Sequence, residues 1–358
     1  MRGGQARREP ARGASTSTTD SLMLSKNVRL GVIVLLLAMP LARGTAQSGD
    51  LDPQCTAGTT AQRATQDFCQ KAIDTFQFLA PQLGISIVGG SATLGQGTAL
   101  GGIGKFSVGL RANLIPGRVP RVDQVTPNPL GATRTTYEVE DRILGFPTVD
   151  AAAGVFPGIP MGPGGAKVLA VDIIANLAFV PDVTEENVSI VTPDGAVKFG
   201  FGGRLGLIQE SGAAPGIGVS YLRRDLPRID IEASVGNDRL AVRSIDVESQ
   251  AWRVMLQKRV ALVTVVVGAG RDHYETSALA DVEVTVAGNV FTRSNIQARQ
   301  DLNRDNIFAD VALNLSVFKI AGELGYVRGG TIETYNGFGN SSADKAHAYG
   351  SLGIRLSF

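Results

Sequence analysis

Apolar and polar residues alternate along much of this chain. The clearest alternation covers residues 104–115, 168–180, 197–209 and 306–317. A period of two predicts β-strands with one apolar and one polar face. These runs have 12 or 13 residues, whereas strands of globular proteins usually have about five or six and a tilted membrane-crossing strand needs roughly nine to eleven. Their length favours strands that cross a membrane, with apolar side chains toward lipid and polar ones inward.

The last eight residues continue this alternation and end on an aromatic residue. Leu352, Ile354, Leu356 and Phe358 are apolar, and the residues between them are polar or small. This segment resembles the C-terminal signal of bacterial outer-membrane β-barrel proteins. The residues that fit the slots of that signal are Ser351, Gly353, Leu356 and Phe358. The resemblance implies a place in the outer membrane of a Gram-negative cell, contact with its lipid, and insertion by the barrel-assembly machinery.

The whole pattern predicts an all-β fold, an antiparallel transmembrane β-barrel of about fourteen strands. An even number agrees with both barrel ends lying in one compartment. Twelve strands are the alternative, because the short segments within 217–246 could merge. A soluble sandwich or lipocalin-like barrel would alternate in the same way, but strand length and Phe358 favour the membrane. The expected strands are 104–115, 148–155, 168–180, 197–209, 217–224, 229–235, 239–246, 250–258, 261–271, 274–286, 290–300, 306–317, 320–330 and 346–358.

This order of strands also predicts which connections lie on each side of the membrane. Periplasmic turns of such barrels are short and outer loops are longer. The expected periplasmic turns are 236–238, 259–260, 287–289 and 318–319. The expected outer loops are 116–147, 181–196 and 331–345.

The N-terminal residues 1–46 have the features of a secretory signal peptide with an upstream extension. A basic stretch at 23–29 precedes an uncharged apolar run at 30–41, and small residues lead to a cleavage site after Ala46. Twelve residues are too few for a helical span, which needs about 20. Translation could start at Met1 or Met23. A tail held by an interfacial helix is the competing interpretation.

Charge and composition exclude some functions. Residues 1–46 hold seven basic and two acidic residues, and the remainder holds 27 basic and 31 acidic residues. A mildly acidic exported chain gives no reason to expect nucleic-acid binding. The 44 glycines and 16 prolines favour many turns over long helices.

Residues 47–83 are predicted to form a helical segment ahead of the barrel, which covers 84–358. Apolar residues spaced by three and four predict a helix over 60–79, ended by Pro81 and Gly84. Cys55 and Cys69 are the only cysteines, and export to an oxidising compartment predicts a disulfide between them. This segment could plug the barrel or lie in the periplasm.

Alternation places a set of charged residues inside the expected barrel. In the hairpin 274–300, acidic and basic rows would face each other across the ladder. They would either brace the interior with ion pairs or line a selective pore. The candidates are Lys105, Arg111, Asp172, Lys198, Arg204, Glu275, Asp281, Glu283, Arg293, Arg299, Asp310, Glu323 and Arg355.

The sequence contains no combination of residues that predicts catalysis, a metal site or a cofactor. His273 follows Asp272 at an expected outer turn, but no Gly-x-Ser-x-Gly motif accompanies it. The stretch 95–101 misses the Gly-x-Gly-x-x-Gly spacing by one residue, so a flexible glycine-rich turn is expected there.

Two functions remain open. A fourteen-stranded barrel with an N-terminal plug is similar in architecture to the long-chain fatty-acid transporter family, which moves hydrophobic compounds inward. That family's plug carries Asn-Pro-Ala, whereas the nearest string here is Asn128-Pro129-Leu130 in a loop, so no binding residue is transferred. We therefore expect a channel or transporter for small or hydrophobic compounds of unidentified structure. The alternative is a closed structural or adhesive barrel that acts through its outer loops.

Overall fold

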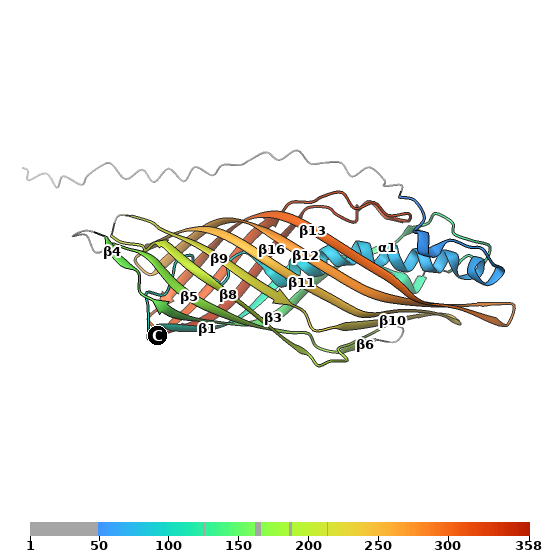
Figure 1. Cartoon of the computed structure of the whole chain (residues 1–358), viewed down its shortest axis with the longest axis horizontal. Coiled ribbons are helices and arrows are strands. Elements are labelled where there is room, and N and C mark those ends of the chain that lie inside the picture. The colour runs from blue at the N-terminus through green and yellow to red at the C-terminus, as the bar shows by residue number, and fades with distance from the viewer. Residues whose placement is uncertain (1–48, 125, 162–165, 186–187, 213) are drawn as a thin grey trace, which may run out of the picture. The chain divides into compact units, whose positions relative to one another are not determined.

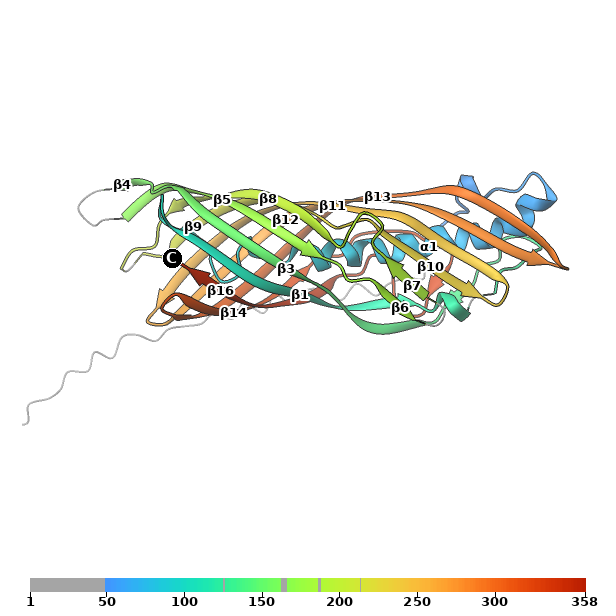
Figure 2. The same cartoon turned by 90° about the horizontal axis from the view of Figure 1, so that it is seen from below.

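The computed structural model describes residues 49–358 except 125, 162–165, 186–187 and 213, so the predicted signal peptide and its cleavage at Ala46 lie outside the described residues. One antiparallel sheet curls around the helix α1, which lies toward the end opposite the C-terminus (Figures 1 and 2). No helix in the described part of the chain is long and apolar enough to span a membrane. The elements are η1 (Pro53–Cys55), α1 (Thr60–Val88), β1 (Phe106–Pro120), η2 (Val122–Gln124), β2 (Thr136–Tyr137), β3 (Val139–Phe156), β4 (Ile159–Met161), β5 (Ala166–Phe179), β6 (Val183–Glu185), β7 (Val188–Val191), β8 (Val197–Ile208), β9 (Gly216–Asp225), β10 (Ile229–Val235), β11 (Asp238–Val260), β12 (Val263–Val286), β13 (Asn289–Leu315), β14 (Phe318–Val327), β15 (Gly337–Phe338) and β16 (His347–Ser357).

The main sheet has fourteen strands, but only ten of them close the ring, so the barrel itself has fewer strands than the predicted fourteen. The ring order is β1, β3, β5, β8, β9, β11, β12, β13, β14 and β16, and β16 pairs with β1 to complete it. β10, β7 and β6 extend β11 into a side sheet, and β4 pairs with β5. The division of the strands was wrong in three places, because 239–246 with 250–258, 261–271 with 274–286, and 290–300 with 306–317 are each one strand.

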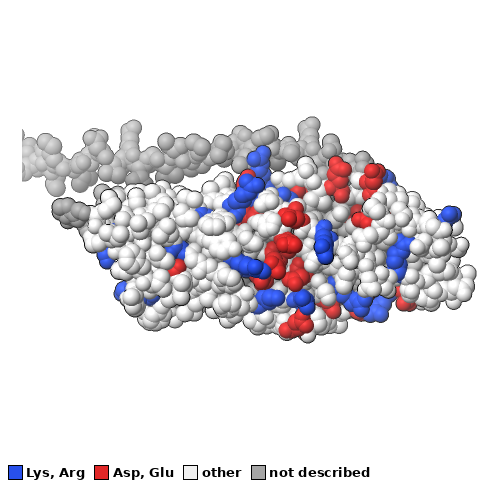
Figure 3. Space-filling view, viewed as in Figure 1, with Lys and Arg blue, Asp and Glu red and all other residues white. Residues whose placement is uncertain are grey.

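The strands β11, β12 and β13 are much longer than a membrane requires. They have 23, 24 and 27 residues, against 10 in β14 and 11 in β16. The exposed large apolar side chains of the long strands, such as Val265 on β12 and Val311 on β13, lie in the part of each strand nearest Phe358, except for Val290 at the outer tip of β13. Charged side chains gather over the middle and right of the molecule in Figure 3, and fewer lie at the left. The barrel therefore has a lipid-facing half and an outer half that projects beyond the apolar belt.

Turn lengths orient the barrel. Two-residue turns at 261–262 and 316–317 lie at the same end as Phe106 and Phe358, and the long connections 121–138 and 328–346 lie at the other. Short turns belong on the periplasmic side, so Phe358 lies at the periplasmic end. The predicted periplasmic turns at 236–238 and 287–289 lie at the outer end instead, because the long strands are not interrupted.

Helix α1 begins at a capping box and extends beyond its predicted end. The Thr59 side chain accepts from the Gln62 backbone, and the Gln62 side chain accepts from Thr59. Pro81 lies inside the helix, although proline cannot donate to the carbonyl of Gln77. The Gln300 side chain on β13 donates to that carbonyl at 3.2 Å instead. Contacts with the barrel wall therefore stabilise the helix beyond Pro81, as far as Val88.

Candidate functional site

The outer half of α1 clamps two outer loops. Asp74 accepts four hydrogen bonds, from the Gln70 side chain, the backbone of Tyr335, and the backbone and side chain of Asn336, at 2.7–3.1 Å. Burial raises the pKa of the Asp74 carboxyl, and these hydrogen bonds oppose that rise. Phe78 stacks on Phe338, whose ring also stacks on Tyr137. This side of the helix is therefore covered.

Asp67 and Lys71 hold the second loop, between β1 and β3. The two side chains form a buried ion pair of 2.6 Å. Asp67 also accepts from the backbone of Asn128 and Thr133, and Lys71 donates to the carbonyl of Thr126. The Asn128-Pro129-Leu130 string thus belongs to a loop that caps the helix.

The segment 89–104 leads from α1 to the start of β1, and we call it the strap. Gly89 turns out of the helix with φ of +57°, where a Cβ would come within 2.8 Å of Asn113. Residues 89–99 are buried, which corrects the expected flexible turn at 95–101. Because the strap is neither helix nor strand, its backbone groups need partners from the wall.

Arginine side chains of the barrel wall supply donors to the strap carbonyls. Arg253 donates to Gly89 at 2.9 Å and to Gly90 at 2.8 Å. Arg111 donates to Ser91, Arg204 to Gln96 and Arg355 to Leu94, at 2.7–3.0 Å. Arg224 donates to the carbonyl of Val88, where the strap begins.

Carboxylates of the wall accept from the strap N–H groups. Glu323 accepts from Gly90 and Ser91, both at 2.7 Å. Asp310 accepts from Gly95 at 3.1 Å, and Asp172 accepts from Leu100 at 2.9 Å. These charged groups therefore bind peptide backbone and fill the lumen with the chain's own strap.

Six of the predicted interior charges are buried inside the barrel, and the other seven are not. The buried residues are Arg111, Asp172, Arg204, Asp310, Glu323 and Arg355. The correction concerns Lys105, Lys198, Glu275, Asp281, Glu283, Arg293 and Arg299, which are exposed or half-buried. Most of these residues lie in the outer half, where apolar side chains face α1 rather than lipid. The strand face that was predicted to point inward therefore points outward there.

Several interior charges were missed. Arg253 pairs with Asp272 at 2.5 Å, and Asp150 lies 3.1 Å from Arg111. Arg224 is also fully buried. Arg253 could have been found by continuing the alternation of 250–258, since it lies between the lipid-facing Trp252 and Val254.

The cysteines and the histidine also have defined places. Cys55 and Cys69 form a disulfide that ties η1 to α1 at the outer end. His273 lies 3.4 Å from Asp301 on the outward face, whereas the neighbouring Asp272 points inward. Alternation along β12 separates the two, so Asp272 does not orient His273.

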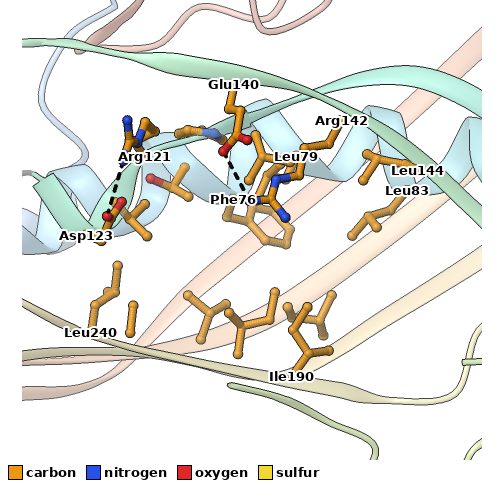
Figure 4. Close-up of a pocket in the computed structure, with 18 of the residues that line it drawn as sticks. Phe76, Leu79, Leu83, Arg121, Asp123, Glu140, Arg142, Leu144, Ile190 and Leu240 are labelled. Carbon is orange, nitrogen blue, oxygen red and sulfur yellow. Dashed lines mark hydrogen bonds and ion pairs between the residues drawn. The ribbon is translucent and has the colours of Figure 1, made fainter. Parts of the chain in front are cut away.

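An apolar pocket of about 540 Å³ lies between α1 and the wall of the outer half. Figure 4 shows Phe76, Leu79 and Leu83 on the helix side, and Leu240 and Ile190 across from them. Fifteen of its lining residues are apolar: Phe76, Leu79, Ala80, Leu83, Val119, Pro120, Val122, Leu144, Val183, Ile190, Ile231, Ala233, Leu240, Val242 and Ile245. This size and lining are typical of sites for small hydrophobic ligands.

The charged residues of the pocket lie at one side and pair with each other. Arg142 approaches Glu140 at 3.2 Å, and Arg121 approaches Asp123 at 3.9 Å (Figure 4). Thr75 is the remaining polar lining residue. The described lining therefore has balanced charge and favours an uncharged guest.

No family model matches the sequence, and no curated protein matches it. Among solved structures, the chain is similar to the translocator domain of the autotransporter NalP from Neisseria meningitidis, with 12% identity, a TM-score of 0.38, and 72% and 89% of the two chains covered. It is also similar to the outer membrane protease OmpT from Escherichia coli (8%, 0.36, 71% and 96%) and to the Pseudomonas putida toluene transporter TodX (10%, 0.26, 71% and 89%). These scores assign the chain to none of their families.

The closed antiparallel ring, its lipid-facing apolar belt and its polar interior define the class. The chain is a bacterial outer-membrane β-barrel. Its lumen holds the strap, and its outer half holds the apolar pocket.

Proposed function

We propose that this barrel takes up uncharged hydrophobic compounds, and that capture in the pocket beside α1 is the first step. The pocket is the observation that carries the proposal, because about 540 Å³ bounded mainly by apolar side chains suits a small hydrophobic ligand. The paired charges at its side argue against an anionic ligand. Because the lumen is filled, a transporter that binds its ligand and releases it stepwise is favoured, and an open channel is not.

Binding is tested with a tryptophan placed in the pocket. Trp252, the only tryptophan, faces lipid and is replaced by Phe, and Phe76→Trp supplies the reporter. We expect 1-bromodecane to quench this reporter in detergent with a saturable concentration dependence. Ala80→Leu, which adds atoms inside the pocket, should weaken binding about tenfold. The matched control Ala309→Leu lies on the lipid-facing surface and should bind as the parent does.

The anionic analogue 11-bromoundecanoate tests the class of ligand. We expect it to bind at least about tenfold more weakly, because its carboxylate would lose water without gaining an unpaired cation. Equal binding of both compounds would contradict the uncharged class. Reporter quenching that does not saturate, or that Ala80→Leu leaves unchanged, would contradict capture in this pocket.

The second candidate is a closed surface barrel, and the strap favours it. A lumen filled by hydrogen-bonded backbone should carry no steady ion current in a planar bilayer. Absence of both current and ligand binding would support the closed barrel. A steady current from the unmodified protein would contradict the filled lumen on which both candidates rest.

A further inference from the structure

The barrel wall forks in its outer half. β3 pairs with β5 from Phe156 up to Thr148, which lies opposite Ala178. Beyond that point the described residues of β3 pair with β1 alone. The pairing with β5 stops before Pro147, which has no N–H for a ladder. The chain after β5 leaves toward β6 and the side sheet.

The apolar pocket fills this fork. Leu144 on one arm lies four residues from Thr148, and Val183 on the other lies five residues from Ala178, and both line the pocket. Phe146 and Val180, nearer the vertex, pack into the same buried apolar cluster as α1. Between the vertex and the pocket, the residues of both arms are therefore apolar or small except Asp182, which accepts hydrogen bonds from Thr192.

Lipid-facing side chains lie directly beneath the vertex. Val149 and Leu177 face each other one step below it, and 38% and 41% of their surfaces are exposed. Phe179 is the last residue of β5 and pairs with Val197 of β8. The side chains of both residues face outward. Pocket-lining Val183 follows lipid-facing Phe179 by only four positions along the chain, a span of at most about 15 Å.

We propose that hydrophobic compounds reach the pocket sideways through this fork, directly from the outer leaflet of the membrane. This inference rests on the proposed function and names the source of its ligand. Hydrophobic compounds concentrate in lipid, and an apolar lip lets them move into the pocket without crossing water. The alternative approach from the outside medium meets the loops that Asp67 and Asp74 clamp over α1.

The fork lies where the bilayer tolerates unpaired strand edges. An unpaired strand edge is not tolerated within the hydrocarbon region. On β3 beyond the vertex, the outward-facing Asp141 pairs with Arg118 at 2.9 Å, as expected at or above the lipid headgroups. The fork thus opens at the outer boundary of the apolar belt, where a compound leaves the leaflet.

The test places a charge on the lip and measures ligand entry from membranes. Phe179→Asp is compared with Ile307→Asp, which alters a similarly exposed lipid-facing residue of β13 away from the fork. Both carry the Phe76→Trp reporter in proteoliposomes, and vesicles preloaded with 1-bromodecane deliver the ligand. We expect quenching to be about tenfold slower in Phe179→Asp, because the ligand must pass an ionised side chain, and unchanged in Ile307→Asp.

Equilibrium quenching in detergent separates this inference from the proposed function. Phe179→Asp should bind 1-bromodecane there as the parent does, since Phe179 does not line the pocket. Intact binding with an unchanged rate of entry from membranes would overturn the lateral route. No binding by the parent protein would instead overturn the proposed function. If Phe179→Asp fails to give an SDS-resistant barrel, Phe179→Ser provides the same comparison without a charge.

Discussion

At the scale of single residues, the interior charges are ligands of the chain's own backbone. Arg253 alone binds the carbonyls of Gly89 and Gly90 and the carboxylate of Asp272. A buried charge is tolerated only when its partners are complete, and removing one partner leaves the others without compensation. The strap therefore depends on the whole set of wall residues as well as on its own glycines, such as Gly89 with its positive φ.

We predict that Arg253→Met lowers the free energy of unfolding by about 3–5 kcal/mol, because it leaves the carboxyl of Asp272 buried without its cation. The double variant Arg253→Met with Asp272→Leu should recover part of this loss. Urea unfolding in lipid vesicles, followed by the fluorescence of Trp252, measures both.

The matched control is Arg223→Met. Arg223 pairs with Glu248 at 2.5 Å where both side chains remain partly exposed, so its loss should cost less than about 1 kcal/mol. An equally small effect of Arg253→Met, or a double variant less stable than the single one, would contradict the assigned role of this ion pair.

At the scale of elements, the alternation predicted where strands lie but not where they end. Along β12, outward positions are apolar at Val263, Val265 and Val267, whereas the inward positions from Tyr274 to Val284 are apolar except Thr276. The apolar face changes sides because the first part meets lipid and the second meets α1. A pattern that inverts within one strand is indistinguishable, in sequence, from two strands of opposite phase.

The same reason limits what could be predicted of the site. Charges of the membrane half, such as Arg111 and Glu323, were placed correctly because lipid fixes which face is apolar. The strap could not be predicted, because its backbone partners come from distant strands and not from local pattern. The pocket likewise combines α1 with strands up to about 170 residues away.

We predict that the disulfide stabilises the start of α1 locally. Replacing Cys55 and Cys69 with Ser opens a loop of 15 residues and should cost about 3 kcal/mol in the chain-entropy model. Tryptic cleavage after the exposed Arg63 should become up to about 100-fold faster, while the barrel still resists SDS before boiling.

Reduction provides the control for this prediction. Dithiothreitol should bring the parent protein to the cleavage rate of the double variant and leave the double variant unchanged. Equal cleavage rates for parent and double variant would show that wall contacts, such as those of Arg293 with η1 and α1, hold this segment without the cross-link.

At the scale of the molecule, the ring closes where the chain's last strand meets its first. β16 pairs with β1 over eight residue pairs, and Phe358 and Phe106 exchange backbone hydrogen bonds. Their rings stack at 4.7 Å. Closure of this seam also encloses α1 and the strap, since the strap runs directly into β1. The C-terminal segment predicted to direct assembly is therefore also the segment that seals the barrel around its plug.

These two roles of Phe358 give different outcomes. If the assembly machinery recognises the terminal aromatic residue, deleting Phe358 should lower the amount in the outer membrane at least about fivefold, and Phe106→Ala, which removes the same ring stack, should leave it near normal. If stacking at the seam is what counts, both variants should fall together. Quantitative immunoblots of outer-membrane fractions with and without boiling distinguish these results. Unchanged amounts after deletion of Phe358 would exclude both roles, because neither recognition nor closure would then depend on the residue on which the chain ends.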